Sequence, residues 1–184
     1  MVMPLPLPSF TTDDLRSFPE DGQRYELLEG VLLVTPAPGS AHQVVLGRLL
    51  AAVHGHLVTD GLAYAVSPGE IEIAPKTLLD PDLLVFPSTY APGTPWRKMS
   101  GWWLAAEVFS PSSRMYDRAY KRDAYLSLGV REVWLVDLDE RAVFVSRRGE
   151  AERDIRHGGE LRWTPEELRE PLAIDIASLF HGLL

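Results

Sequence analysis

The sequence contains no cysteine, and its basic residues are outnumbered. Without cysteine there is no disulfide, no thiolate nucleophile and no cysteine-ligated zinc or iron–sulfur site. Any metal ion must therefore be bound by carboxylate, carbonyl or histidine ligands. The 26 acidic residues exceed the 18 basic ones and give a net charge of −8 with histidine neutral. Such a chain repels nucleic acid at long range, so nucleic-acid binding requires a local basic patch.

Long apolar runs are also missing. None approaches the roughly 20 residues that a membrane-spanning helix needs. Residues 1–9 begin without basic residues and are interrupted by prolines, which is typical of an extended lead-in and not of a signal peptide. These features predict a cytoplasmic protein with no membrane partner. With 184 residues, 46% hydrophobic and 24% charged, the chain is expected to form one globular domain over residues 1–184.

The first half of the chain alternates helical and extended patterns. Thr11–Asp14 is expected to begin a short helix, and two strands between Tyr25 and Thr35 are expected to bend at Glu29–Gly30. A long amphipathic helix, capped by Ser40, should extend to about Leu57. Three strands are expected between Leu62 and Val85. The apolar side of the long helix is predicted to consist of Val44, Leu46, Leu49, Leu50 and Val53.

The second half contains two strongly apolar segments, Trp102–Phe109 and Val133–Val136, which are typical of buried strands. Between them a helix is expected over Arg114–Leu128, capped by residues 110–113 and ended by Gly129. A hairpin to Val143–Val145, a polar stretch from about Gly149 and a short helix at 175–180 complete the pattern. This order predicts an α/β (α+β) fold, with a central mixed sheet flanked by helices and built around a strand–helix–strand unit.

Two acidic residues interrupt the apolar strands. Asp82 follows Pro81 at the entry to one strand, and Glu107 lies among apolar residues of another. A buried carboxylate without a partner costs several kcal/mol, so each needs a cation or hydrogen-bond donors. If the two strands are neighbours, both carboxylates can bind one Mg²⁺ or Mn²⁺ ion. The alternatives are a turn aspartate that bonds its own backbone and a glutamate in a structural ion pair.

The helix expected after Glu107 is basic. Its cations are spaced so that they share one helical face, and they comprise Arg114, Arg118, Lys121 and Arg122. A lysine beside metal-bound carboxylates can hold a water molecule or stabilise charge on a phosphate. On its own, Lys121 is equally typical of a solvated helix.

An ordered set of motifs resembles the Uma-two family of restriction-endonuclease-like proteins. The resemblance covers roughly residues 10–148, with a motif core at about 25–137. The motifs are Tyr25–Gly30, His42-Gln43, Pro81-Asp82, Glu107–Ser113, Lys121-Arg122 with Tyr125, Gly129-Val130 and Trp134–Asp137. Each motif alone is weakly specific, whereas the ordered set is specific.

The resemblance implies a fold and a site. The family is placed in the PD-(D/E)XK nuclease superfamily, which makes Asp82 and Glu107 the expected metal ligands, with Glu26 as an additional upstream acid. Val31 stands where relatives often carry glutamate, which leaves Glu29 open as the alternative acid. Superfamily members usually carry a lysine two residues after the second acid, where this chain has Phe109. The resemblance offers Lys121 instead, and it places His42 at the rim of the catalytic site.

These observations predict a Mg²⁺- or Mn²⁺-dependent endonuclease acting on nucleic acid, DNA before RNA, with Lys121, Glu107, Asp82 and His42 as catalytic residues. Arg114, Arg118 and Arg122 are expected to contact the nucleic-acid backbone, and a homodimer is compatible with cutting two strands. The rival hypothesis is a catalytically inactive nucleic-acid-binding or assembly module on the same fold. Convergence of the acids and Lys121 favours the enzyme, whereas carboxylates far apart or sealed by arginines favour the module.

Overall fold

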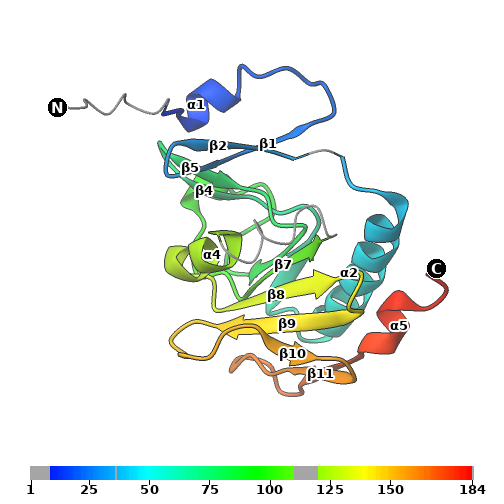
Figure 1. The fold of residues 1–184 in the computed structure, drawn as a ribbon. Coiled ribbons are helices and arrows are strands. Elements are labelled where there is room, and N and C mark those ends of the chain that lie inside the picture. The colour runs from blue at the N-terminus through cyan, green and yellow to red at the C-terminus, as the bar shows by residue number, and fades with distance from the viewer. Residues whose placement is uncertain (1–8, 36, 110–119, 184) are drawn as a thin grey trace.

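The computed structural model describes residues 9–35, 37–109 and 120–183. Most of the proline-rich lead-in, the expected helix cap at 110–113, and both Arg114 and Arg118 lie outside these residues. No helix in the described part of the chain is long and apolar enough to cross a membrane. Figure 1 shows the elements stacked from a small sheet beneath helix α1 (Thr12–Leu15) down to a hairpin near the C-terminal helix α5 (Ile176–Phe180).

A six-stranded mixed sheet forms the centre of the fold. Its third and fourth strands are parallel, and every other neighbouring pair is antiparallel. The described part of the connecting helix, α4 (Arg122–Leu128), ends at Gly129, whose φ of 105° suits glycine. The expected strand–helix–strand unit and mixed sheet are thereby confirmed. In spatial order the strands are β10 (Ile155–His157), β9 (Ala142–Arg147), β8 (Glu132–Asp137), β7 (Leu104–Phe109), β6 (Leu83–Pro87) and β3 (Ala63–Val66).

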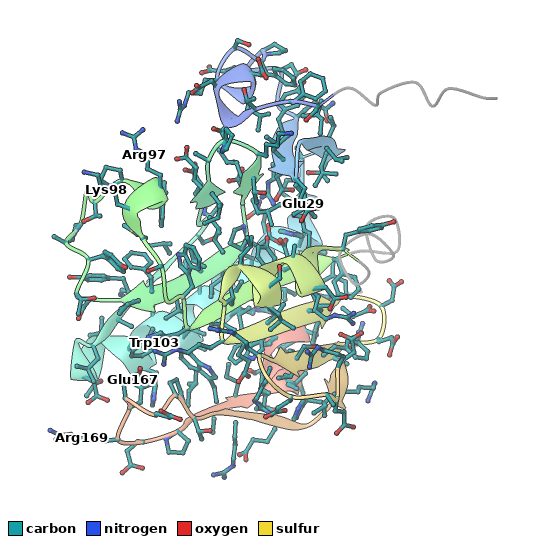
Figure 2. All side chains as sticks on the ribbon, turned by 90° about the vertical axis from the view of Figure 1, so that its left-hand side faces the viewer. Glu29, Arg97, Lys98, Trp103, Glu167 and Arg169 are labelled. Atoms are coloured by element: carbon teal, nitrogen blue, oxygen red, sulfur yellow. The ribbon has the colours of Figure 1, made fainter. Side chains whose placement is uncertain are left out.

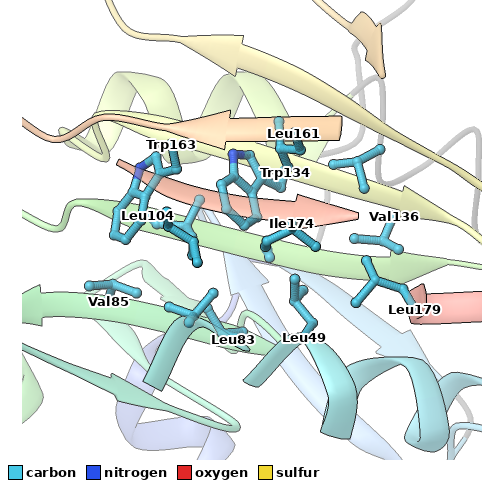
Figure 3. Close-up of a cluster of buried hydrophobic side chains, with 14 of the residues drawn as sticks. Leu49, Leu83, Val85, Leu104, Trp134, Val136, Leu161, Trp163, Ile174 and Leu179 are labelled. Carbon is cyan, nitrogen blue, oxygen red and sulfur yellow. The ribbon is translucent and has the colours of Figure 1, made fainter. Parts of the chain in front are cut away.

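The two faces of this sheet pack against different layers. On one face, helices α2 (Ser40–Asp60) and α5 and the hairpin β11 (Glu160–Trp163)–β12 (Leu172–Asp175) cover an apolar cluster. Figure 3 shows Leu49 of α2 approaching the strand residues there, beneath the two tryptophans Trp134 and Trp163. The opposite face packs against α4 and a second sheet. Both faces are covered, which explains why β7 and β8 are buried at every position.

The second sheet has four strands, in the order β2 (Val31–Thr35), β1 (Arg24–Leu28), β5 (Thr77–Leu79) and β4 (Ile71–Ile73). The expected bend between β1 and β2 is confirmed, because Glu29 and Gly30 have φ values of 50° and 85°. This sheet contributes Ile71 and Leu79 to the apolar cluster on the α4 side of the large sheet. Strand β1 is thereby held over the face of β7 that carries Glu107.

Several local predictions are wrong. The cap of α2 is Gly39 and not Ser40, which is the first helical residue and makes no capping bond. Val44 is 41% exposed, and its neighbour Val45 is fully buried instead, whereas Leu46, Leu49 and Val53 are buried as expected. Residues 62–85 form three strands and the start of a fourth, since the three-residue strand β5 was not expected.

The polar stretch after Gly149 also departs from expectation, because it contains the three short strands β10, β11 and β12. Strand β11 alternates exposed and buried residues, with Leu161 and Trp163 facing the core. Alternation over only four residues is a weak signal, and the charged outward positions concealed it.

Candidate active site

Asp82 and Glu107 come from neighbouring antiparallel strands. Leu83 of β6 pairs with Ala106 of β7, so the adjacent residues Asp82 and Glu107 lie side by side. The backbone N–H of Val108 donates to Asp82 Oδ2 at 2.9 Å and ties the aspartate to β7. Both acids are almost wholly buried, at 1% and 3% exposure. The expectation that their strands are neighbours is confirmed.

Lys121 lies between two acids. Its Nζ atom is 3.0 Å from Glu107 Oε1 and 2.7 Å from Glu26 Oε2. Glu26 comes from β1, and its other oxygen accepts a 2.9 Å hydrogen bond from the backbone N–H of Asp80. Glu26 and Lys121 are 0% and 2% exposed, so three separate elements bring a lysine and two carboxylates together away from water.

The upstream acid of the cluster is Glu26 and not Glu29. Glu29 lies at the exposed turn between β1 and β2, where Figure 2 labels it. The two residues were open alternatives in the sequence because Val31 stands where relatives often carry glutamate, and because Glu26 and Glu29 alternate onto opposite faces of a strand. Once the strand ends at Leu28, only Glu26 faces the buried side with Lys121.

Tyr125 supports Glu107 from α4. One turn after Lys121, its hydroxyl donates to Glu107 Oε1 at 2.6 Å, and the side chain is fully buried. Burial, followed by the negative charges of Glu107 and Glu26, raises the pKa of Tyr125 well above its usual value. The phenol therefore stays protonated and remains a hydrogen-bond donor to the carboxylate.

Asp82 has two further partners. His42, in the first turn of α2, places Nε2 2.9 Å from Asp82 Oδ2. Arg24 of β1 donates from Nη1 to Asp82 Oδ1 at 3.0 Å. Burial by itself raises the pKa of Asp82, but the His42 ring, the Arg24 charge and the Val108 N–H together lower it to about 2. Asp82 is therefore ionised at neutral pH.

A fourth carboxyl group, Asp80, lies beside the cluster. Burial, followed by the negative charges of Glu26 and Glu70, raises the pKa of Asp80 to about 7. Neighbouring negative charges also act on Arg24, where they stabilise the charged form of the side chain. Burial lowers the pKa of Arg24, but the charges of Asp82, Glu107 and Glu26 outweigh it and raise that pKa above its ordinary value. The site thus favours bound cations and disfavours a further negative charge.

The arginines expected to contact nucleic acid are only partly described. Arg122 does not extend into solvent beside Lys121, because its guanidinium pairs with Asp123 at 2.9 Å and with Asp154 at 2.5 Å. Lys121 and Arg122 thus contact different acids and do not form one basic face. On the short helix η1 (Trp96–Lys98), Arg97 and Lys98 are exposed, and Figure 2 shows both at the edge of the molecule.

Comparison with known proteins identifies the family. Residues 12–177 match the Uma2 family, whose description is "Putative restriction endonuclease". The chain belongs to the Uma2 family. No curated protein matches the sequence. Among solved structures, a "putative nuclease belonging to DUF820" from Anabaena variabilis is similar, with a TM-score of 0.76 and 21% identity over 93% of this chain and 97% of that chain. The family resemblance and the restriction-endonuclease-like fold are confirmed.

The donor set of this Uma2 chain fits a hard divalent cation. Glu26, Asp82 and Glu107 supply carboxylate oxygens, the ligands that Mg²⁺ and Mn²⁺ prefer. Glu26 Oε2 is buried without a hydrogen-bond donor, and its contact with Lys121 is an ion pair that lacks hydrogen-bond alignment. In the present arrangement Lys121 lies between two of the acids. Among the described positions, no three histidine or acidic residues are grouped so that they could hold a metal ion. The chemistry fits, and the ligand oxygens are at present compensated by cations of the protein.

The sequence interpretation missed Arg24 and Asp80. Arg24 is two residues before Glu26 on the same strand, and side chains two apart on a strand face the same side. That spacing was the available signal. Asp80 gave no comparable signal, because Asp80-Pro81-Asp82 resembles an ordinary turn and its contact with Glu26 is made by the backbone.

Proposed function

We propose that this chain is a Mg²⁺- or Mn²⁺-dependent nuclease that hydrolyses phosphodiester bonds in nucleic acid, with DNA as the first substrate class. The observation that carries the proposal is the meeting of Glu26, Asp82, Glu107 and Lys121 in one buried cluster. Membership of a restriction endonuclease family and the nuclease-like fold support the same reaction class. Hydrolysis adds water across one P–O bond and leaves a phosphate monoester and a hydroxyl.

Each side chain of the cluster has a role in this reaction. Asp82, Glu107 and Glu26 would hold the divalent cation. When bound, the cation lowers the pKa of a water molecule and offsets negative charge on the phosphate. Lys121 neutralises Glu107 and Glu26 and positions the attacking water beside them.

Two residues orient the acids. Tyr125 fixes one oxygen of Glu107 through its 2.6 Å hydrogen bond, and His42 fixes Asp82 through its 2.9 Å contact. Groups that hold metal ligands in place commonly set their affinity and orientation. We therefore assign His42 a positioning role at the site.

For the substrate, the proposal keeps Arg114 and Arg118 as contacts to the nucleic-acid backbone and a homodimer for double-strand cutting, and it leaves out Arg122, whose guanidinium is paired with Asp123 and Asp154. A net charge of −8 opposes nucleic-acid binding at long range, so the affinity must come from local cations. We expect weak, strongly salt-dependent binding as a result.

The proposal is tested by incubating the protein with plasmid, linear and single-stranded DNA at low salt, with Mg²⁺, Mn²⁺ or EDTA. We expect cleavage with either metal, none with EDTA, and none by Glu107→Gln. Glu29→Gln is the matched control, because it removes the same charge at the exposed turn and should cleave like the wild type. Equal cleavage by Glu107→Gln and the wild type would exclude the proposed site.

A second candidate function is a nucleic-acid-binding or assembly module without turnover. It is favoured by the compensation of the carboxylates by Arg24 and Lys121 in the present arrangement. Absence of cleavage on every substrate, together with absence of Mn²⁺ binding by calorimetry, would support this candidate over the nuclease.

A further inference from the structure

Two cations reach the carboxylate cluster, and they differ in their access to solvent. The side chain of Lys121 is 2% exposed and lies between Glu26 and Glu107. The side chain of Arg24 is 28% exposed, although its partner Asp82 is buried. Arg24 therefore connects the interior of the site to the outside, where a polymeric substrate must approach.

The guanidinium of Arg24 is only partly used within the protein. Its Nη1 atom donates to Asp82 Oδ1 and, at 3.4 Å, to the carbonyl oxygen of Asp80. Within residues 9–35, 37–109 and 120–183, Nε and Nη2 have no hydrogen-bond partner, and neither is a buried orphan. Arg24 thus presents further donors to solvent while it remains anchored to an acid of the site.

The charges of the cluster create a need for such a group. Glu26, Asp82 and Glu107 carry three negative charges, against two positive charges from Arg24 and Lys121. A phosphate that approaches this cluster is repelled unless a cation faces it. Lys121 cannot turn outward without leaving two buried carboxylates uncompensated, whereas Arg24 can accept a phosphate through its outward nitrogens without losing Asp82.

We propose that Arg24 is a further catalytic residue, which binds the phosphate group to be hydrolysed and holds it next to Asp82. The inference rests on the proposed nuclease function and names the contact that recognises the substrate. Guanidinium suits this task because its planar fork of N–H donors matches phosphate oxygens in pairs. The direct contact with phosphate is thereby assigned to β1, and Lys121 acts on the acids and the water.

The experiment compares Arg24→Gln and Arg24→Lys with the wild type. Arg162→Gln is the control, because Arg162 also pairs with an acidic residue, Glu160, but lies on β11, at the opposite end of the molecule from β1 (Figure 1). Binding of a fluorescein-labelled DNA duplex of about 20 base pairs is measured by anisotropy in Ca²⁺ over a range of salt concentrations. Single-turnover cleavage of the same duplex is measured in Mn²⁺, and Mn²⁺ affinity by calorimetry.

We expect Arg24→Gln to slow single-turnover cleavage by about 10²–10³-fold, the usual effect of removing one donor to a reacting group. Arg24→Lys keeps the charge but loses the fork, so its rate should be intermediate. The salt dependence of duplex binding should weaken by about 0.9 in logarithmic slope for Arg24→Gln, which corresponds to one lost phosphate contact. Mn²⁺ affinity should change by less than the roughly tenfold expected for a lost orienting partner, because the Arg24 charge also competes with a cation for Asp82.

Three results would overturn the inference. Wild-type cleavage and salt slope in Arg24→Gln would show that Arg24 does not contact phosphate, while loss of cleavage in Glu107→Gln would leave the nuclease function standing. A salt slope unchanged in Arg24→Gln together with a large loss of Mn²⁺ affinity would make Arg24 a support for Asp82 only. A wild type that neither binds nor cleaves the duplex, and that also leaves plasmid and single-stranded DNA intact, would overturn both proposals. Arg24→Lys separates loss of function from misfolding, because a lysine at this position retains the ion pair with Asp82 and should leave the fold intact.

Discussion

Lys121 places its Nζ atom 3.0 Å from Glu107 Oε1, although the two residues are 14 positions apart in the sequence. The position two residues after Glu107 is Phe109, which is fully buried in the apolar cluster on the same face of the sheet. A cation there would have to be buried among apolar groups. The helix that follows β7 instead brings a lysine to the acid from above the sheet. The site therefore keeps its positive charge while the strand keeps its apolar packing.

Replacing Lys121 with methionine should both abolish cleavage and destabilise the fold. The change removes the shared cation of Glu26 and Glu107 and leaves two buried carboxylates uncompensated. Breaking a buried ion pair in this way costs about 3–5 kcal/mol in free energy of unfolding at pH 7. Urea unfolding measures the loss.

The matched control is Lys76→Met, because Lys76 is exposed and its replacement removes an equal charge. It should change the free energy of unfolding by no more than about 0.5 kcal/mol. Equal stability of the two variants would contradict the role assigned to Lys121.

Tyr125→Phe should weaken the site without removing a charge. The variant loses only the 2.6 Å hydrogen bond to Glu107, because the ring still fills its buried position. A hydrogen bond to a charged group is worth about 1.5–3 kcal/mol, so we expect a loss of that size in urea unfolding and slower cleavage. Tyr64→Phe, at an exposed position of β3, is the control. A Tyr125→Phe variant as stable as this control would rule out the proposed support of Glu107.

The centre of the fold could be predicted because its strands are buried on both faces. Segments such as Val133–Val136 are short, continuous apolar runs, a pattern typical of strands in the middle of a covered sheet. The peripheral strands could not be predicted, because a strand such as β11 is short and presents Glu160 and Arg162 to solvent. Their formation depends on pairing with distant segments, which leaves little mark on local sequence.

The site residues likewise include some that could be predicted from the sequence and others that could not. Glu107 could be identified because a charge within an apolar strand requires a partner. The family resemblance offered Lys121 and Glu26 as members of the site, but their contacts required the fold, since the two meet only when β1 is placed over β7. Arg24 was missed because an arginine at the start of a strand is common, and its spacing from Glu26 gains meaning only once the fold shows its contact with Asp82.

His42→Ala should lower the affinity for Mn²⁺. His42 Nε2 lies 2.9 Å from Asp82 Oδ2, so the variant removes one of the two partners of this oxygen and leaves the Val108 N–H as the other. Loss of such a partner typically costs about 10–100-fold in metal affinity. Calorimetric titration with Mn²⁺ measures the change. His54→Ala is the control, because His54 is exposed on the same helix, and an equal affinity in both variants would remove His42 from the site.

Asp80→Asn should stabilise the protein at neutral and alkaline pH. Burial and the charges of Glu26 and Glu70 raise the pKa of Asp80 from 3.8 to about 7, whereas Arg24 and Lys121 act in the opposite sense. Between these two pH values the folded chain holds a proton that the unfolded chain has released, so this group makes stability fall as pH rises. Above about pH 7 the penalty is constant, on the order of 2–4 kcal/mol.

Asparagine cannot ionise, so the variant should gain stability relative to the wild type progressively from pH 4 to 7 and show no gain below pH 4. Urea unfolding at pH 4, 5.5, 7 and 8 measures this difference. Asp60→Asn, at the end of α2, is the matched control, because it removes an equal charge outside the carboxylate cluster. A pH-independent difference between Asp80→Asn and the wild type would mean that Asp80 is ionised throughout. Another carboxyl group of the cluster would then hold the proton in place of Asp80.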